Sequence, residues 1–291
     1  LAGGVNRFAH FRTPTPVEQQ PTIRMNRDTL YSMVVVDVSD DATLVLPEAG
    51  ERYLSAMVVN QDHFIPRVFH GGGRHRLDRK AMETDYVLVI IRTLVDAADP
   101  DDVAAVNALQ DAMAIEAGSS QPFVPPAYDE DSFDGLVAAI LGLGPYVPDS
   151  TGMFGARDDV APVKHFIGTA GGWGGLPETE AIYVHVDPRL PPDRYRIDVP
   201  EDVPVEAFWS ISLYNGNGFF EPNTFGAYNI NSVTGERNRD GSMTVHLGGC
   251  EDGRSNCLPI MDGWNYTVRL YRPGNDILDG SWTFPEARRI D

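Results

Sequence analysis

The sequence has few cations, few cysteines and no long apolar run. Its 291 residues include 23 Lys and Arg against 42 Asp and Glu, which gives a formal net charge of -19. Nucleic acids and anionic lipids bind clustered cations, so we expect neither as a partner. No stretch approaches the roughly 18 apolar residues that a membrane-spanning helix needs, and we therefore expect no membrane insertion.

The remaining composition is that of a folded protein. Hydrophobic residues make up 42% of the chain and aromatic residues 10%, which a solvated acidic tail would not contain. Single hydrophobic cores rarely grow past roughly 250 residues, so a chain of this length favours two domains. We place the boundary at about residue 150, which gives domains 1–150 and 151–291.

Runs of β-branched and aromatic residues between turn residues predict strands in both halves. In the first half these runs cover residues 30–38, 43–46, 53–59 and 86–93. In the second half they cover residues 181–186, 195–199, 208–214, 243–247, 266–271 and 281–284. Short strands at this spacing indicate antiparallel sheets, and we expect two β-sandwich or jelly-roll domains.

The middle of the chain has a different pattern. Apolar residues recur at helical spacing over residues 101–117 and again over residues 132–141, and a glycine follows each run. Several prolines lie between and after these two segments. The whole pattern predicts a mainly β protein with a short helical, proline-rich middle segment.

Two cysteines, Cys250 and Cys257, flank six residues in a turn-rich stretch. The spacing matches neither a redox Cys-x-x-Cys motif nor a zinc knuckle, and only His246 is close in sequence as a further ligand. We expect a disulfide that pins a loop, with two free thiols as the alternative. A disulfide would indicate a periplasmic or secreted protein.

The segment from Asn26 to Tyr31 places two titratable groups and a guanidinium at the start of a strand. Asp28 is a candidate general base, Tyr31 a candidate acid, and Arg27 a candidate substrate-binding group. Asp28 and Tyr31 converge only if the strand bends, because neighbouring side chains of an extended chain alternate. The alternative is a buried network in which Arg27 and Asp28 bind backbone groups.

Asp62 and His63 follow the strand predicted over residues 53–59. His63 is a candidate catalytic proton carrier, because an unperturbed imidazole titrates near neutral pH. Asp62 is a candidate substrate-binding residue that orients a neighbouring group or binds a metal. The alternative is that His63 is a hydrogen-bonded histidine at a sheet edge.

His70 and His75 flank three glycines that permit a tight turn. Together with Asp62 and His63 they are candidate metal ligands, and His165 would join them in a metalloenzyme. Nothing in the spacing makes these side chains face one another, and a hairpin loop explains the glycines equally well. We expect no bound metal and no organic cofactor.

A glycine-rich stretch, residues 168–175, follows His165 and contains Trp173. Glycines allow the backbone to approach a ligand, and an indole offers a flat apolar surface. We expect His165, Trp173 and Tyr183 to bind substrate, with Glu178 as a catalytic carboxylate beside them. Such a pocket suits an uncharged ring-containing molecule. The alternative is that Trp173 fills a core between the domains.

Two kinds of polar residue in the C-terminal strands match no catalytic motif. Ser210 and Ser212 lack the strained Gly-x-Ser-x-Gly turn of serine hydrolases. Arg269 is expected to form an ion pair at the surface or between domains, where such pairs contribute little.

Both halves contain motifs of known families. The run Arg-Met-Asn-Arg-Asp-Thr-Leu-Tyr-Ser at residues 24–32, with Leu-Pro at 46–47 and Arg-Tyr at 52–53, resembles the bacterial domain of unknown function 1254. The second half resembles its usual partner, the domain of unknown function 1214. The stretches that carry this second resemblance are residues 172–183, 203–215, 256–260 and 263–273. The resemblance implies two β-sandwich or jelly-roll domains and, often, export, but no particular reaction.

These observations lead to three hypotheses. The first is an exported protein with a small-molecule pocket near the domain junction, acting as an acid-base hydrolase, lyase or isomerase on a neutral ring-containing substrate. The second is a non-enzymatic ligand-binding or assembly protein. The third is a histidine-dependent metalloenzyme. We expect a small-molecule ligand and a homo-oligomer, with no nucleic acid partner and no membrane insertion.

Overall fold

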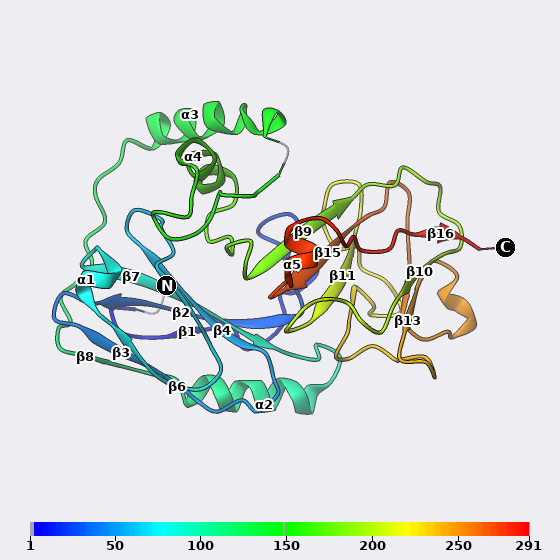
Figure 1. Cartoon of the computed structure of the whole chain (residues 1–291), viewed down its shortest axis with the longest axis horizontal. Helices are drawn as coiled ribbons and strands as arrows, with labels where there is room; N and C mark the ends of the chain where they lie inside the picture. Colours follow the sequence, from blue (N-terminus) through cyan, green and yellow to red (C-terminus); the bar gives the residue numbers. More distant parts are fainter. Residues whose placement is uncertain (1–2, 148, 291) are drawn as a thin grey trace. The chain divides into compact units, whose positions relative to one another are not determined.

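The computed structural model describes residues 3–147 and 149–290. They form a mainly β protein with several sheets and a helical middle segment (Figure 1). The chain divides into two compact units, neither of which is continuous in sequence. Unit 1 comprises the described residues up to Arg12, Leu30–Leu94 and Ala104–Glu178, and unit 2 comprises Thr13–Thr29, Val95–Val103 and the described residues from Thr179 onward.

Unit 1 is built on two sheets (Figure 1). The five-stranded sheet has the order β1 (Ala9–His10), β2 (Thr29–Asp37), β7 (Tyr86–Leu94), β4 (Leu54–Asn60) and β5 (Arg67–His70). The three-stranded sheet has the order β6 (Gly73–Leu77), β3 (Ala42–Leu46) and β8 (Ala114–Ala117). β4 pairs antiparallel with β5 and β7, and β3 pairs antiparallel with β6 and β8.

The core of unit 1 takes every second side chain from strands of both sheets. Val34 and Val36 of β2, Leu44 of β3, Val58 of β4 and Val89 of β7 are at most 1% exposed and belong to one apolar cluster. A strand presents alternate residues to opposite faces, so this cluster uses one face of each sheet. The opposite face of the five-stranded sheet also carries buried side chains, among them Met57 and Val59 of β4 and Ile90 of β7.

The helices of unit 1 differ in part from those predicted. They are α1 (Arg79–Met82), α2 (Pro100–Asp111, in unit 1 from Ala104 onward), α3 (Glu130–Leu141), α4 (Pro162–Gly171) and a 3-10 turn at Gly144–Tyr146. The helix predicted over residues 132–141 is α3. The helix predicted over residues 101–117 ends at Asp111, because Ala114–Ala117 pair with β3 instead. Within the described ranges, no helix has both the length and the apolar character to cross a membrane.

Unit 2 contains two sheets as well, each with four strands. The first has the order β12 (Asn229–Asn231), β11 (Trp209–Tyr214), β15 (Asn265–Tyr271) and β9 (Ala181–Val186). The second has the order β14 (Cys257–Leu258), β13 (Met243–Leu247), β10 (Tyr195–Val199) and β16 (Arg288–Arg289), and a short α5 (Asn275–Leu278) precedes β16. All pairs are antiparallel except β13 with β14. One apolar cluster joins side chains of both sheets.

Residues 281–284 do not form the strand that their composition predicts. Their backbone is irregular, although Trp282 and Phe284 both pack against the core cluster of unit 2. The rings of these two residues are 6.0 Å apart, centroid to centroid, in an edge-to-face arrangement. Side-chain burial alone therefore explains the apolar pattern of this segment.

The predicted disulfide is present in unit 2. Cys250 and Cys257 are bonded, with their Cα atoms 5.6 Å apart. The bond joins a 3-10 turn at Cys250–Asp252 to β14, which begins at Cys257. It therefore pins the loop between β13 and β14, as the turn-rich spacing indicates.

Candidate functional site

A turn organised by Asn60 positions His63 in unit 1. Asn60 is the last residue of β4, and its side-chain Oδ1 accepts hydrogen bonds from the backbone N–H groups of Asp62 and Phe64, at 3.1 and 2.9 Å. Its Nδ2 donates to the carbonyl of Met82 at 3.2 Å. His63 then has a φ of 66°, in the left-handed region that few non-glycine residues occupy. The turn directs the imidazole inward, and His63 is only 4% exposed.

Both ring nitrogens of His63 are bonded within the protein. Its Nε2 accepts a hydrogen bond from the backbone N–H of Gly174 at 3.0 Å, and its Nδ1 lies 2.9 Å from Oγ1 of Thr169. Thr169 Oγ1 in turn donates to the carbonyl of His165 at 2.8 Å. Because a backbone N–H only donates, the neutral ring carries its proton on Nδ1. Burial and the nearby His165 lower the pKa of His63 to about 4.

Helix α4 presents His165 and Thr169 on one face, because residues four apart are neighbours on a helix. His165 Nδ1 lies 2.8 Å from the carbonyl oxygen of Met153, which can only accept, so this nitrogen carries the proton. Nε2 of His165 therefore has a free lone pair, and no described residue forms a hydrogen bond to it. Nε2 of His165 is therefore able to accept a proton from a ligand.

Aromatic and imidazole rings form a continuous series around these histidines. The rings of Phe64 and His165 stack with centroids 4.7 Å apart and planes inclined by 10°. The ring of His63 lies 5.6 Å from that of His165 and 5.2 Å from that of Trp173. At the far end of the series, the guanidinium carbon of Arg157 lies 4.1 Å from the centroid of Phe64. Each ring thus fixes the plane of the next.

A cavity of about 410 Å³ opens beside this series of rings, and we refer to it as the His165 cavity. It is lined by Asp62, Phe64, Arg157, Val160, Pro162, His165, Phe166 and Thr169, all residues of unit 1. Its volume falls in the range of about 300 to 1,000 Å³ typical of small-molecule sites. Half of its lining residues are apolar, and the polar ones are Asp62, Arg157, His165 and Thr169.

The charges around the His165 cavity sum to a small negative value. Arg157 Nη2 lies 3.2 Å from Asp62 Oδ2, and its Nε donates to Glu83 Oε2 at 3.0 Å. One guanidinium therefore faces two carboxylates at the rim. The geometry favours a neutral ligand over an anion.

The structure thus brings together four of the residues singled out from the sequence. Asp62 and His165 line the cavity, and His63 and Trp173 support it from behind through ring contacts. Trp173 is 55% exposed, so it does not fill a core. The glycines around it serve packing: a Cβ on Gly175 would lie 2.6 Å from the ring of Phe154.

Two other candidates in unit 1 lie outside the cavity lining. Glu178 accepts a hydrogen bond from the backbone N–H of Gly152 at 2.9 Å and closes the loop between them. Tyr31, on β2, has the guanidinium carbon of Arg92 5.4 Å from its ring centroid. Arg92 also donates to the carbonyl of Gly174 at 3.3 Å, so Tyr31 connects indirectly to the residue that binds His63.

The metal candidates His70 and His75 lie on separate strands, β5 and β6. The ring of His75 stacks on Phe69 with centroids 4.5 Å apart, and the ring of His70 lies 6.3 Å from that of Tyr53. Across the part of the chain that the structure describes, no three His, Cys, Asp or Glu side chains are grouped in a way that could hold a metal ion.

Asp28 belongs to a buried polar cluster in unit 2. It is 0% exposed and accepts hydrogen bonds from Ser210 Oγ at 2.6 Å, Asn229 Nδ2 at 2.7 Å and Asn231 Nδ2 at 3.5 Å. Burial raises the pKa of Asp28, whereas the charge of Arg269 and these hydrogen bonds oppose the rise. The arrangement matches the buried-network alternative for this residue.

Arg269 lies in the same cluster rather than at the surface, where the sequence pattern placed it. It is 3% exposed and donates to Ser212 Oγ, to the hydroxyl of Tyr214 and to the carbonyl of Arg24, each at 2.8 Å. β11 and β15 each carry polar residues on one face, and residues 24–28 cover that face, so the guanidinium binds backbone carbonyls under them.

Arg27 and Tyr183, predicted to bind substrate, also lie in unit 2. Arg27 donates to the carbonyl of Thr15, and its guanidinium carbon lies 5.0 Å from the ring centroid of Tyr228. Tyr183 is on the edge strand β9, opposite Arg269 of β15. Neither residue lines a described cavity.

Several residues of the His165 cavity were not found from the sequence. Phe64, Arg157, Phe166 and Thr169 carry no catalytic motif, because an aromatic ring, a surface arginine and a threonine are common in any fold. One signal was available for Thr169. It stands four residues after His165 in a segment without an internal proline, which places the two on one helix face.

Two family models match the chain. Protein of unknown function (DUF1254) matches residues 5–73, and Protein of unknown function (DUF1214) matches residues 188–275. No curated protein matches the sequence.

Two solved structures resemble the chain. The VPA0106 protein from Vibrio parahaemolyticus aligns with a TM-score of 0.76 at 18% identity, over 92% of this chain and 90% of that one. An uncharacterized protein from Burkholderia cenocepacia aligns with a TM-score of 0.57 at 17% identity, over 99% of this chain and 82% of that one. At such identities the likeness concerns the fold alone.

Proposed function

We propose that this chain, which combines a DUF1254 domain with a DUF1214 domain, is an acid-base enzyme that binds a small molecule in the His165 cavity. One observation carries the proposal. The Nδ1–H of His165 donates a hydrogen bond to the carbonyl of Met153, Nε2 keeps a free lone pair, and the residue lines a cavity. This is the tautomer and the support that a general base requires.

The reaction begins when Nε2 of His165 takes a proton from an O–H, N–H or activated C–H group of the substrate. The imidazole then becomes positive, and the carbonyl of Met153 stabilises it through the Nδ1–H bond. In an isomerase the proton returns to another atom of the substrate, and in a lyase it passes to the leaving group. In a hydrolase His165 takes the proton from the attacking water and gives it to the leaving group.

His63 has a positioning role in this proposal, and His165 takes the proton-carrying role that the sequence suggested for His63. Both nitrogens of His63 are engaged by Gly174 and Thr169, so the ring is not available to a substrate. It holds Thr169, whose hydroxyl in turn binds the backbone of His165. The neutral ring also adds no charge that would oppose protonation of His165.

The proposed substrate is neutral and contains a ring. Phe64 and Phe166 offer apolar surface in the lining, and the Arg157 charge is already neutralised by Asp62 and Glu83. An anion would add to a local excess of carboxylate. We propose the His165 cavity, whose lining lies within unit 1, as the small-molecule pocket expected from the sequence.

Phenol tests the proposal, because it is a small neutral ring with one O–H donor. Long-range 1H–15N spectra of the histidine rings should show a shift of His165 Nε2 on addition of phenol, and Phe166→Ser should weaken the effect. His70→Gln, which alters a histidine of β5, is the matched control and should leave the shift unchanged. A phenol complex in which His165 Nε2 does not shift would refute the proposed base.

Turnover provides the second test. Neutral aromatic esters, lactones and phenols can be screened for conversion by the full chain, and any activity should be lost in His165→Gln. Activity that survives His165→Gln but is lost on a change elsewhere would place the site outside the His165 cavity.

A second candidate function, self-assembly, is favoured by α3. Phe133, Leu136 and Leu141 of this helix are 52%, 56% and 45% exposed, and only Ile140 of the helix is buried. The first five residues of α3 include three acidic ones, whereas residues 136–147 carry no charge. Two copies packed antiparallel would place each acidic end beside the uncharged end of the other.

Sedimentation velocity distinguishes this candidate. A dimer of the full chain that dissociates in Leu136→Ser would support it, because the residue is exposed and its change should not disturb folding. A monomer at all concentrations would exclude it.

We also propose that each unit is a β-sandwich and that the protein is located outside the cytoplasm. The first proposal is supported by the single apolar cluster that the two sheets of each unit share. The second is supported by the Cys250–Cys257 disulfide, since such bonds persist in oxidising compartments. Cell fractionation, with thiol alkylation before lysis, tests the location.

A further inference from the structure

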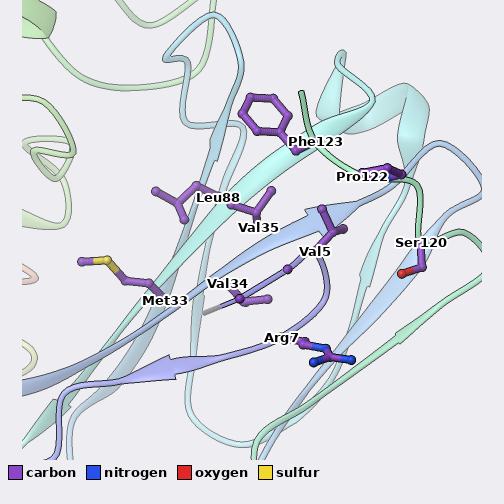
Figure 2. Close-up of a pocket in the computed structure, with 11 residues that line it drawn as sticks. Val5, Arg7, Met33, Val34, Val35, Leu88, Ser120, Pro122 and Phe123 are labelled. Carbon is purple, nitrogen blue, oxygen red and sulfur yellow. The ribbon is translucent and has the colours of Figure 1, made fainter. Parts of the chain in front are cut away.

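A second cavity of unit 1, of about 530 Å³, lies on the five-stranded sheet, and we call it the Arg7 cavity (Figure 2). Val34 and Val36 of β2 point into the core, so Met33 and Val35 face the opposite side. The apolar lining comprises Val5, Met33, Val35, Leu88 and Phe123, with Val34 and Pro122 beside them. The cavity shares no lining residue with the His165 cavity.

Hydrogen bonds from Asn6 hold the walls of the Arg7 cavity in place. The backbone N–H of Asn6 donates to the carbonyl of Val35 at 2.7 Å, and its side-chain Nδ2 donates to the carbonyl of Ser119 at 2.8 Å. Its Oδ1 accepts from the backbone N–H of Asp37 at 3.0 Å. One side chain thus joins the N-terminal segment, β2 and the segment that follows β8.

Asp37 of β2 also holds the segment that follows β8. Its Oδ2 accepts hydrogen bonds from Ser119 Oγ at 2.6 Å and from the backbone N–H of Gln121 at 2.7 Å. The ring of Tyr86 packs edge-on against that of Phe123, with centroids 5.2 Å apart. The segment over residues 119–123 is therefore held on the sheet by specific bonds, and the cavity beneath it is a built feature.

The polar side chains of this cavity include a positive charge and no negative charge. Arg7 and Ser120 contribute side-chain donors, and the lining contains no carboxylate. Within the described residues, Arg7 has no carboxylate at ion-pair distance, although the chain as a whole carries a net charge of -19. In Figure 2 the apolar side chains of Leu88 and Phe123 lie apart from the polar groups of Arg7 and Ser120.

We propose that the Arg7 cavity binds an amphipathic monocarboxylate, such as a medium-chain fatty acid. The aliphatic chain covers Met33, Leu88 and Phe123, and the carboxylate accepts hydrogen bonds from the guanidinium of Arg7 and the hydroxyl of Ser120. A guanidinium matches a carboxylate with two parallel hydrogen bonds. The net charge of the chain does not prevent this, because at physiological ionic strength salt largely screens exposed charges that lie more than about 8 Å away.

Decanoate below its micellar concentration is the probe, and the methyl group of Met33 is the reporter. The full chain is labelled with 13C-methyl methionine, and Met33→Leu identifies the resonance. We expect decanoate to shift the Met33 methyl resonance and to bind at least about tenfold more tightly than 1-decanol or decyltrimethylammonium.

Two arginine variants separate a specific carboxylate site from an apolar groove. Arg7→Gln should weaken decanoate binding about tenfold and leave decanol binding unchanged. The matched control is Arg67→Gln, an exposed arginine of β5 that does not line the cavity, and it should leave both unchanged.

Three outcomes would overturn the proposal. Decanoate that leaves the Met33 resonance in place does not bind there. Equal affinities for decanoate and decanol, or a decanoate affinity that Arg7→Gln does not alter, would mean that the cavity has no carboxylate specificity. Because Arg7 is exposed, its substitution should not disturb folding, and the dispersion of the methionine spectrum verifies this directly.

Discussion

Acidification should destabilise unit 1 through His63, whose imidazole the fold holds neutral. Burial, and then the charge of His165, lower the pKa of His63 from 6.5 to about 4. In the unfolded chain the ring takes up its proton near its ordinary pKa, so the unfolded state binds more protons between these two values. The stabilisation is complete above about pH 6.5 and is lost as the pH falls toward 4.

The expected magnitude follows from linkage. A difference of one pKa unit corresponds to about 1.4 kcal/mol, and at pH 4.5 the His63 term should amount to about 2.5 kcal/mol. Protonation of Nε2 would also break the hydrogen bond that this nitrogen accepts from the Gly174 N–H. At still lower pH, protonation of carboxylates also changes the stability. Burial would raise the pKa of Asp37, but hydrogen bonds from Ser119, Ser39 and Gln121 lower it to about 2.

Urea unfolding at about pH 7.5 and pH 4.5 provides the assay, with His63→Asn as the variant. Asparagine tolerates the left-handed backbone of this position and does not titrate. The wild type should lose about 2.5 kcal/mol more than His63→Asn between the two values. The difference between the two proteins is the measure, because His185 of unit 2 also has a pKa lowered to about 4.

NMR gives the site-specific counterpart. The Gly174 amide resonance should titrate together with the His63 ring, well below pH 6, and His70→Asn should leave this behaviour unchanged. A His63 ring that titrates near 6.5, or equal losses of stability in wild type and His63→Asn, would refute the reasoning.

Three further predictions concern stability. Asp28→Ala should cost about 3 kcal/mol because it leaves buried donors unpaired, and Asp28→Asn should cost less; equal, small losses in urea unfolding would contradict the buried cluster. Replacing Cys250 and Cys257 by Ser should cost about 2 kcal/mol, and reductant should then no longer affect unfolding. Gly175→Ala should lower the melting temperature because a ring lies 2.6 Å from the new Cβ, whereas Gly135→Ala, in an open helix position, should raise it slightly.

The strands and the disulfide could be predicted because their causes are local. Alternating β-branched residues bury one face wherever a sheet forms, and β2 and β10 follow their predicted ranges within one residue. Two cysteines seven residues apart in a turn can close a loop without help from the rest of the fold. The segment over residues 281–284 shows the limit of this reasoning, because its apolar pattern reflects packing without a partner strand.

The site depended on information that no local pattern contains. The sequence indicated His63 and His165 separately, 102 positions apart, but only the fold brings their rings to 5.6 Å. The fold also distinguishes the two rings, since Nε2 of His63 accepts a hydrogen bond from Gly174, whereas no described residue forms a hydrogen bond to Nε2 of His165. Arg269 was misplaced for a similar reason. Its burial requires the carbonyl groups of residues 24–25, more than 240 positions earlier in the chain.

The buried cluster of unit 2 joins residues from both family matches. Arg24 and Asp28 lie within residues 5–73, matched by DUF1254, whereas Ser210, Asn229 and Arg269 lie within residues 188–275, matched by DUF1214. Asp28 accepts from the serine and the asparagine, and the Arg24 carbonyl accepts from the arginine. Without residues 24–28, the polar face of β11 and β15 would keep a buried guanidinium and several donors without these acceptors, at a cost of several kcal/mol. Residues 24–28, which lie within the DUF1254 match, therefore belong to the compact unit that contains the DUF1214 match, and their polar groups pair with the buried polar face of β11 and β15.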